Sequence, residues 1–102
     1  MDNIKEFCVI MEGIMLDLRF LRGLDEEKVI KFRDVLEKII DEWKDKDYVP
    51  KLLCNLFIDF YPSVEASSYL YNNEEEKEKI LSFADEMQDL MRICVDVNDK
   101  DL

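Results

Sequence analysis

The sequence contains no histidine, and it has only two glycines and two prolines among 102 residues. Without histidine, the Ser/His and Cys/His pairs of nucleophilic catalysis and the commonest zinc-ligand sets are excluded. Glycine occurs only at Gly13 and Gly23, which also excludes a glycine-rich phosphate-binding loop. So few chain breakers disfavour an all-β or loop-rich fold and favour long helices. We therefore expect a binding protein, not an enzyme, with neither a cofactor nor a metal.

Long apolar runs are missing as well. The longest unbroken run, Phe7–Met11, has five residues, whereas a helix that spans a bilayer needs about 20. The N-terminus has no basic start followed by an apolar core, so it does not resemble a secretion signal. The three cysteines are odd in number and widely spaced, which argues against a disulfide scaffold. We expect a cytoplasmic protein in which Cys8, Cys54 and Cys94 act as small apolar residues.

Positive charge is scarce, because 25 acids stand against 14 lysines and arginines and give a net charge of −11. DNA, RNA and anionic membranes would repel such a chain, so we expect it to bind none of them directly. A basic protein partner would instead be attracted over long range. The alternative is that the acidity only keeps a small protein soluble.

Four amphipathic segments follow one another along the chain, each with apolar residues at spacings of three and four. The first covers residues 3–22, and Gly23 is well placed as its C-terminal cap. The second begins after Asp25, a good N-cap that is followed by two glutamates. The third begins near Pro50. The fourth begins after Asn73, in a pattern similar to a capping box.

These segments predict an all-α fold, namely a compact antiparallel four-helix bundle that forms a single domain over residues 1–102. Residues 95–102 are expected to fray as a charged tail. Pro62 lacks an amide hydrogen and disfavours a helical Tyr61, so the third helix is expected to be bent or broken near Pro62. Residues 63–71 would then form a bent continuation or a separate short turn of helix.

The first helix carries a second apolar strip on another face, formed by Val9, Ile10, Leu16 and Phe20. A helix that is apolar on more than one side is usually central in its bundle. The strip could instead contact a second subunit, which leaves a homodimer open.

The stretch from Leu52 to Asn73 is rich in aromatic residues and contains no lysine or arginine. Phe57 and Phe60 lie on the inward stripe and are expected in the core. Tyrosine offers a large contact area with a polar tip, and acids beside it suit a basic partner. The candidate partner-binding residues of this stretch are Asp59, Tyr61, Glu65, Tyr69 and Tyr71. Alternatively, Tyr61 pins the bend at the proline and Tyr69 covers the end of the bundle.

Two short motifs resemble those of bacterial immunity proteins that neutralise nuclease colicins and related contact-dependent inhibition toxins. One is the acidic start of the second helix, DEEKVIKF, and the other is the Asp-x-Tyr-Pro turn Asp59-Phe60-Tyr61-Pro62. The resemblance covers Asp25 to Leu90, in layout more than in identity. In the colicin DNase group, a short helix ends in a Tyr-Pro step, and its acids and tyrosines bind the toxin. The colicin D-type immunity group similarly uses an acidic helical surface against a basic tRNase active site.

The sequence departs from the DNase group in two respects. Its third helix is longer and more apolar, and the doubled tyrosine of the group is Phe60-Tyr61 here. What carries over is limited to Asp59 and Tyr61 and, by charge alone, to Glu26, Glu27, Asp34 and Glu65.

The resemblance implies an immunity protein that binds a basic nuclease toxin through an acidic, tyrosine-containing surface. The same acidity leaves open a phage or mobile-element inhibitor that mimics nucleic acid, and the apolar strip leaves open a homodimeric scaffold.

Overall fold

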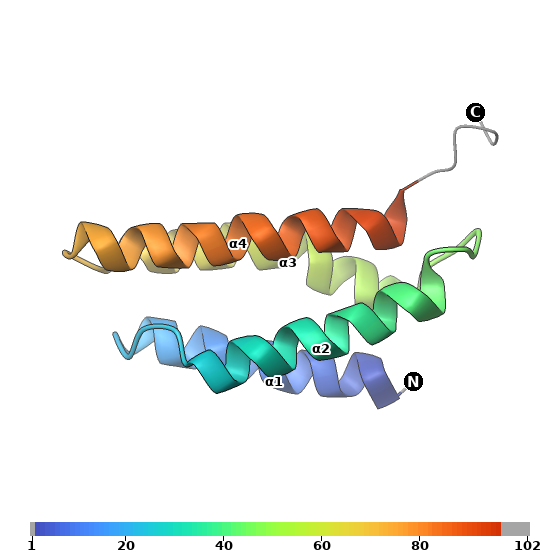
Figure 1. The fold of residues 1–102 in the computed structure, drawn as a ribbon, viewed down its shortest axis with the longest axis horizontal. Coiled ribbons are helices and arrows are strands. Elements are labelled where there is room, and N and C mark those ends of the chain that lie inside the picture. Colours follow the sequence, from blue (N-terminus) through green and yellow to red (C-terminus); the bar gives the residue numbers. More distant parts are fainter. Residues whose placement is uncertain (1, 97–102) are drawn as a thin grey trace.

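The structure is a computed structural model that describes residues 2–96. These residues form four α-helices and no strand, which confirms the all-α prediction (Figure 1). The helices are α1 (Asp2–Arg19), α2 (Glu26–Trp43), α3 (Lys51–Ser68) and α4 (Glu74–Val95). Asp96 is the C-cap of α4, and the remainder of the predicted tail, residues 97–102, lies outside the described residues.

The helices pack as two antiparallel hairpins, which confirms the compact bundle. α1 packs on α2 and α3 packs on α4, while α1 also contacts α3 and α2 also contacts α4. Across the two hairpins, neighbouring helices run in the same direction (Figure 1). The connector 44–50 therefore links two helices that lie on a diagonal. The other two loops, 20–25 and 69–73, lie together at the opposite end of the bundle, which we call the loop end (Figure 1).

Phenylalanines from all four helices form the centre of the core. Phe32 of α2 lies 4.7 Å from Phe7 of α1, 5.3 Å from Phe60 of α3 and 5.6 Å from Phe83 of α4, measured between ring centroids. Phe60 is fully buried and Phe57 is half-buried against the core. These tilted, stacked and edge-on pairs add to the stability that their buried area supplies. The predicted core positions of Phe57 and Phe60 are confirmed.

Helix α3 runs without a break through Pro62. Of the two forms expected here, the broken helix is therefore not the one adopted, and residues 63–68 continue α3. Proline provides no amide hydrogen for the carbonyl four residues earlier, that of Ile58. Ile58 and Pro62 are both exposed, so water can hydrate that carbonyl, which makes a proline tolerable inside this helix.

The C-terminus of α1 differs from the sequence prediction. The helix ends at Arg19, and Leu21 adopts the left-handed conformation with φ 60°. The amide of Leu21 donates to the carbonyl of Leu18, and that of Arg22 donates to that of Asp17, which is the Schellman pattern. Leu21 thus holds the position that glycine prefers, at a cost of roughly 1–2 kcal/mol. Gly23, the predicted cap, lies two residues further on in the loop, with φ 74°.

The predicted N-caps are confirmed. The Asp25 carboxylate accepts from the amides of Glu27 and Lys28, at 2.9 and 3.4 Å. The Asn73 side chain accepts from the amide of Glu76 at 3.2 Å. These bonds satisfy amides that have no partner within their helix.

The second apolar strip of α1 is largely exposed. Val9, Leu16 and Phe20 face solvent, whereas Ile10 is half-buried against the core. Since each helix contacts two neighbours, α1 is not central in the bundle. Within residues 2–96, none of the helices is apolar enough over a sufficient length to cross a membrane.

Candidate protein-interaction surface

Tyr61, Glu65 and Tyr69 follow each other at intervals of four residues along α3, so they lie on one flank of that helix. This flank faces α4, from which Asp85 approaches Tyr61. The Asp85 carboxylate raises the pKa of the Tyr61 phenol, chiefly through hydrogen bonding, with further contributions from burial and from Glu65 and Tyr69. We call these four residues the tyrosine face. It combines two carboxylates with two phenols, which suits lysine and arginine side chains of a partner.

Asp59 lies apart from this face. It precedes Tyr61 by two positions, which is a rotation of about 200° around the helix axis. Asp59 instead shares its flank with Ser63 and Ala66, which line a shallow hollow together with Arg19 of α1. Asp59 is exposed, but the partner surface predicted from sequence is split between two flanks of α3.

Tyr71 must be removed from the candidate surface. Its side chain is buried, with 8% exposure. The hydroxyl donates to the carbonyl of Leu18 at 2.9 Å and accepts from the amide of Gly23 at 3.0 Å. Because both bonds are internal, Tyr71 holds the two loops of the loop end together and presents nothing to a partner.

The acids predicted on α2 fall into two places. Glu26 lines a groove between α2 and α4, opposite Glu86, which pairs with Arg33. Glu27 and Asp34 are seven residues apart and share the outer, exposed face of α2. The tyrosine face lies between α3 and α4, whereas Glu27 and Asp34 lie on the outer face of α2. The eight predicted residues therefore do not form one continuous site.

One buried acid, Asp17, was missed from the sequence. Its carboxylate lies 2.6 Å from the Lys28 ammonium and 3.3 Å from the Arg22 guanidinium. The hydrogen bond from Lys28 is the main cause that lowers the pKa of Asp17, and the bond from Arg22 adds to it against the opposing effect of burial. This cluster joins the end of α1 to the start of α2. The sequence signal that could have identified it is that Asp17 is the one acid in the largely apolar segment 14–21.

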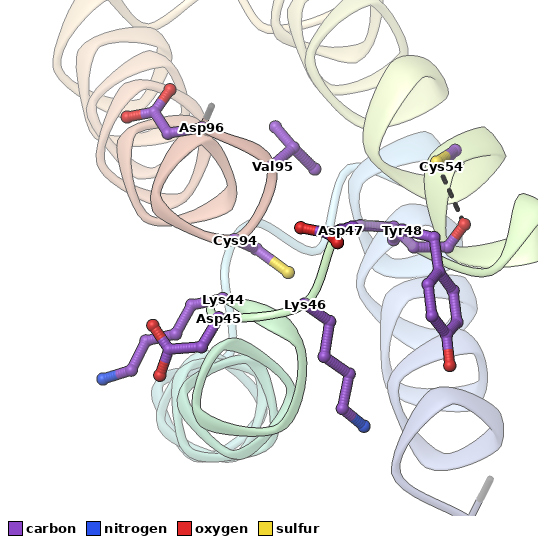
Figure 2. Close-up of a pocket in the computed structure, with 10 residues that line it drawn as sticks. Lys44, Asp45, Lys46, Asp47, Tyr48, Cys54, Cys94, Val95 and Asp96 are labelled. Atoms are coloured by element: carbon purple, nitrogen blue, oxygen red, sulfur yellow. Dashed lines mark hydrogen bonds between the residues drawn. The ribbon is translucent and has the colours of Figure 1, made fainter. Parts of the chain in front are cut away.

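A pocket of about 650 Å³ lies at the other end of the bundle, between the connector 44–50 and the end of α4. Cys94 of α4 and Cys54 of α3 line it, and Cys54 bonds weakly to the carbonyl of Val49 (Figure 2). Burial, and secondarily the nearby Cys54, raises the pKa of the Cys94 thiol. A protonated thiol is a poor nucleophile. Within residues 2–96, no three potential metal ligands gather at one place.

The sequence and the structure were compared with known proteins. No family model matches the chain, and neither curated proteins nor solved structures show a significant likeness to it.

Proposed function

We propose that this protein is a small acidic inhibitor of the immunity type, which acts in the cytoplasm by binding and neutralising a basic toxin domain such as a nuclease. It acts by binding and not by catalysis. Carboxylates on its surface would take the place of the phosphates that such a toxin recognises. The net charge of −11 supports this proposal, because it speeds the capture of a basic partner.

The single observation that carries the proposal is the tyrosine face. Tyr69 is exposed and Tyr61 is half-buried, so both phenols can contact a partner. Glu65 lies between them on α3, and Asp85 reaches the same place from α4. Tyrosine anchors flanked by acids supply both contact area and charge complementarity to a basic surface.

The test is Glu65→Lys, measured against the basic proteins encoded by genes adjacent to this one. We expect the Kd of the Glu65→Lys variant for the basic protein to be about tenfold higher than that of wild type, or more, since like charges across an interface cost several kcal/mol. Circular dichroism checks that the helices are retained.

Asp59→Lys is the matched control. It makes the same charge change in α3, but on the flank opposite the tyrosine face. We therefore expect it to weaken binding much less than Glu65→Lys does. An equal effect of both substitutions would place the contact elsewhere. If none of these basic proteins is bound or neutralised, the proposed function is wrong.

A further inference from the structure

Exposed apolar side chains gather at the loop end. Phe20 is 65% exposed, Leu21 59% and Leu70 52%. Leu21 and Leu70 come from different loops yet line the same shallow hollow. Leu16 is also exposed and lies one helical turn before Phe20. We call these four residues the loop-end patch. Large exposed apolar patches on soluble proteins often mark interaction sites.

The patch is held rigidly by the fold. The Tyr71 hydroxyl donates to the carbonyl of Leu18, in the last turn of α1, and accepts from the amide of Gly23, so it ties loop 69–73 to the end of α1 and to loop 20–25. Leu21 stands at the left-handed position of the α1 cap, where glycine is favoured. An exposed leucine in that conformation contributes little to folding, whereas a contact with a partner would account for it.

The segments around the patch are acidic overall. Glu76 lines the same hollow as Leu21 and Leu70, next to Arg22, whose guanidinium lies over the Phe20 ring at 5.3 Å from its centroid. Residues 19–27 and 69–76 contain six acids and two arginines, a net charge of −4. The acids occupy the N-cap of α2 and the first turns of α2 and α4: Asp25, Glu26, Glu27, Glu74, Glu75 and Glu76. An apolar patch within segments of net negative charge complements a basic partner, and it disfavours both a second copy of this chain and an anionic membrane.

We propose that the loop-end patch is the apolar anchor of an interface for a basic protein, which presents an apolar side chain within a ring of lysines and arginines. This inference rests on the proposed function and specifies its surface. Tyr69, the C-cap of α3, directly precedes Leu70. One partner can therefore cover the patch and reach the tyrosine face.

Backbone-amide NMR of the ¹⁵N-labelled protein tests the surface with a defined probe, a synthetic amphipathic peptide of leucine and lysine. We expect saturable shift changes centred on Phe20–Gly23 and Leu70–Asn72. A peptide of leucine and glutamate with the same pattern is the matched control and should not bind. Equal binding of both peptides, or shifts confined to other faces, would overturn the inference.

Two substitutions test the anchor itself. Leu21→Gly and Phe20→Ser should each raise the Kd for the lysine peptide by about tenfold. Leu21→Gly removes the left-handed leucine, so its thermal midpoint should not fall, and a loss of binding cannot be blamed on unfolding. Val9→Ser is the control, because Val9 is as exposed as Phe20 but lies outside the patch. If Leu21→Gly leaves the Kd unchanged, the patch is not the anchor.

The same variants test two other possible occupants of the patch, a second copy of this chain and an anionic membrane. A dimer detected by sedimentation and lost in Leu21→Gly, or patch-dependent binding to phosphatidylglycerol vesicles, would also overturn the inference.

The failure of this inference can be distinguished from the failure of the proposed function. If a basic protein from an adjacent gene binds equally well to wild type and Leu21→Gly, only the surface is wrong. If no such protein binds while the lysine peptide maps to the patch, only the toxin-inhibitor function is wrong.

Discussion

Removing the hydroxyl of Tyr71 is the sharpest test of how the loop end is held together. This hydroxyl bridges two segments that are about 50 residues apart in the chain, since it bonds to Leu18 and Gly23. Tyr71→Phe keeps the buried ring and deletes only the bridging oxygen. The substitution therefore isolates the two hydrogen bonds from the packing of the ring.

The two lost bonds are not equal in effect. The carbonyl of Leu18 keeps a second donor, the amide of Leu21 at 3.2 Å. The amide of the buried Gly23 loses its bond of 3.0 Å and is left without a partner. An unsatisfied buried group costs about 1–3 kcal/mol, so we expect a total loss of about 2 kcal/mol. For a domain of this size, such a loss lowers Tm by roughly 10 °C.

Urea denaturation followed by circular dichroism measures this change. With a slope of about 1–3 kcal/mol per molar urea, the midpoint should fall by about 1 M. Tyr69→Phe is the matched control, because Tyr69 is 71% exposed and lies only two residues away. Its effect should stay within about 0.5 kcal/mol.

A loss below about 0.5 kcal/mol in Tyr71→Phe, equal to that of the control, would refute this reasoning. It would mean that the bridge contributes nothing beyond the packing of the ring. The rigidity of the loop-end patch would then need another source.

Two further predictions follow from charged groups. Asp17→Asn should destabilise the protein by about 1–2 kcal/mol at neutral pH, a value reduced because Arg22 and Lys28 are partly exposed. Since the pKa of Asp17 is lowered on folding, its contribution is complete above the unfolded carboxyl pKa of about 3.9 and is lost as the pH falls through the folded pKa. The stability difference from wild type should therefore shrink below about pH 4, and a difference that stays constant with pH would contradict this. Asp85→Asn should lower the pKa of the Tyr61 phenol, because Asp85 is the main cause of its increase. A spectrophotometric pH titration checks this, and the Tyr61→Phe variant identifies which signal belongs to Tyr61. A Tyr61 titration that is unchanged in Asp85→Asn would mean that Asp85 does not contact Tyr61.

Local patterns in the sequence were sufficient to predict the helices and much of their capping. Asp25 and Asn73 bond to amides two or three residues later, so their roles depend on immediate neighbours alone. The core position of Phe60 follows from the helical period in the same way. The end of α1 was less predictable, because Leu21 adopts a backbone conformation that its residue type disfavours.

The candidate surface was predictable only in part. The intervals between Tyr61, Glu65 and Tyr69 place them on one flank of a helix without any tertiary information. Nearness in sequence groups Asp59 with them, but helical geometry puts it on the opposite flank. That Asp85 faces Tyr61 depends on which flank of α3 packs against α4, and amphipathic periodicity does not give the order of helices around a bundle.

The sequence by itself determined four amphipathic helices, their N-caps and an excess of negative charge, because each depends on composition or on residues a few positions apart. Only the tertiary structure decided that Tyr71 is an internal bridge, that Asp17 joins α1 to α2, and that Leu21 and Leu70 meet in one exposed patch. These features require distant segments to come together. Their positions are fixed by the packing order of the helices, which brings two distant loops to the same end of the bundle.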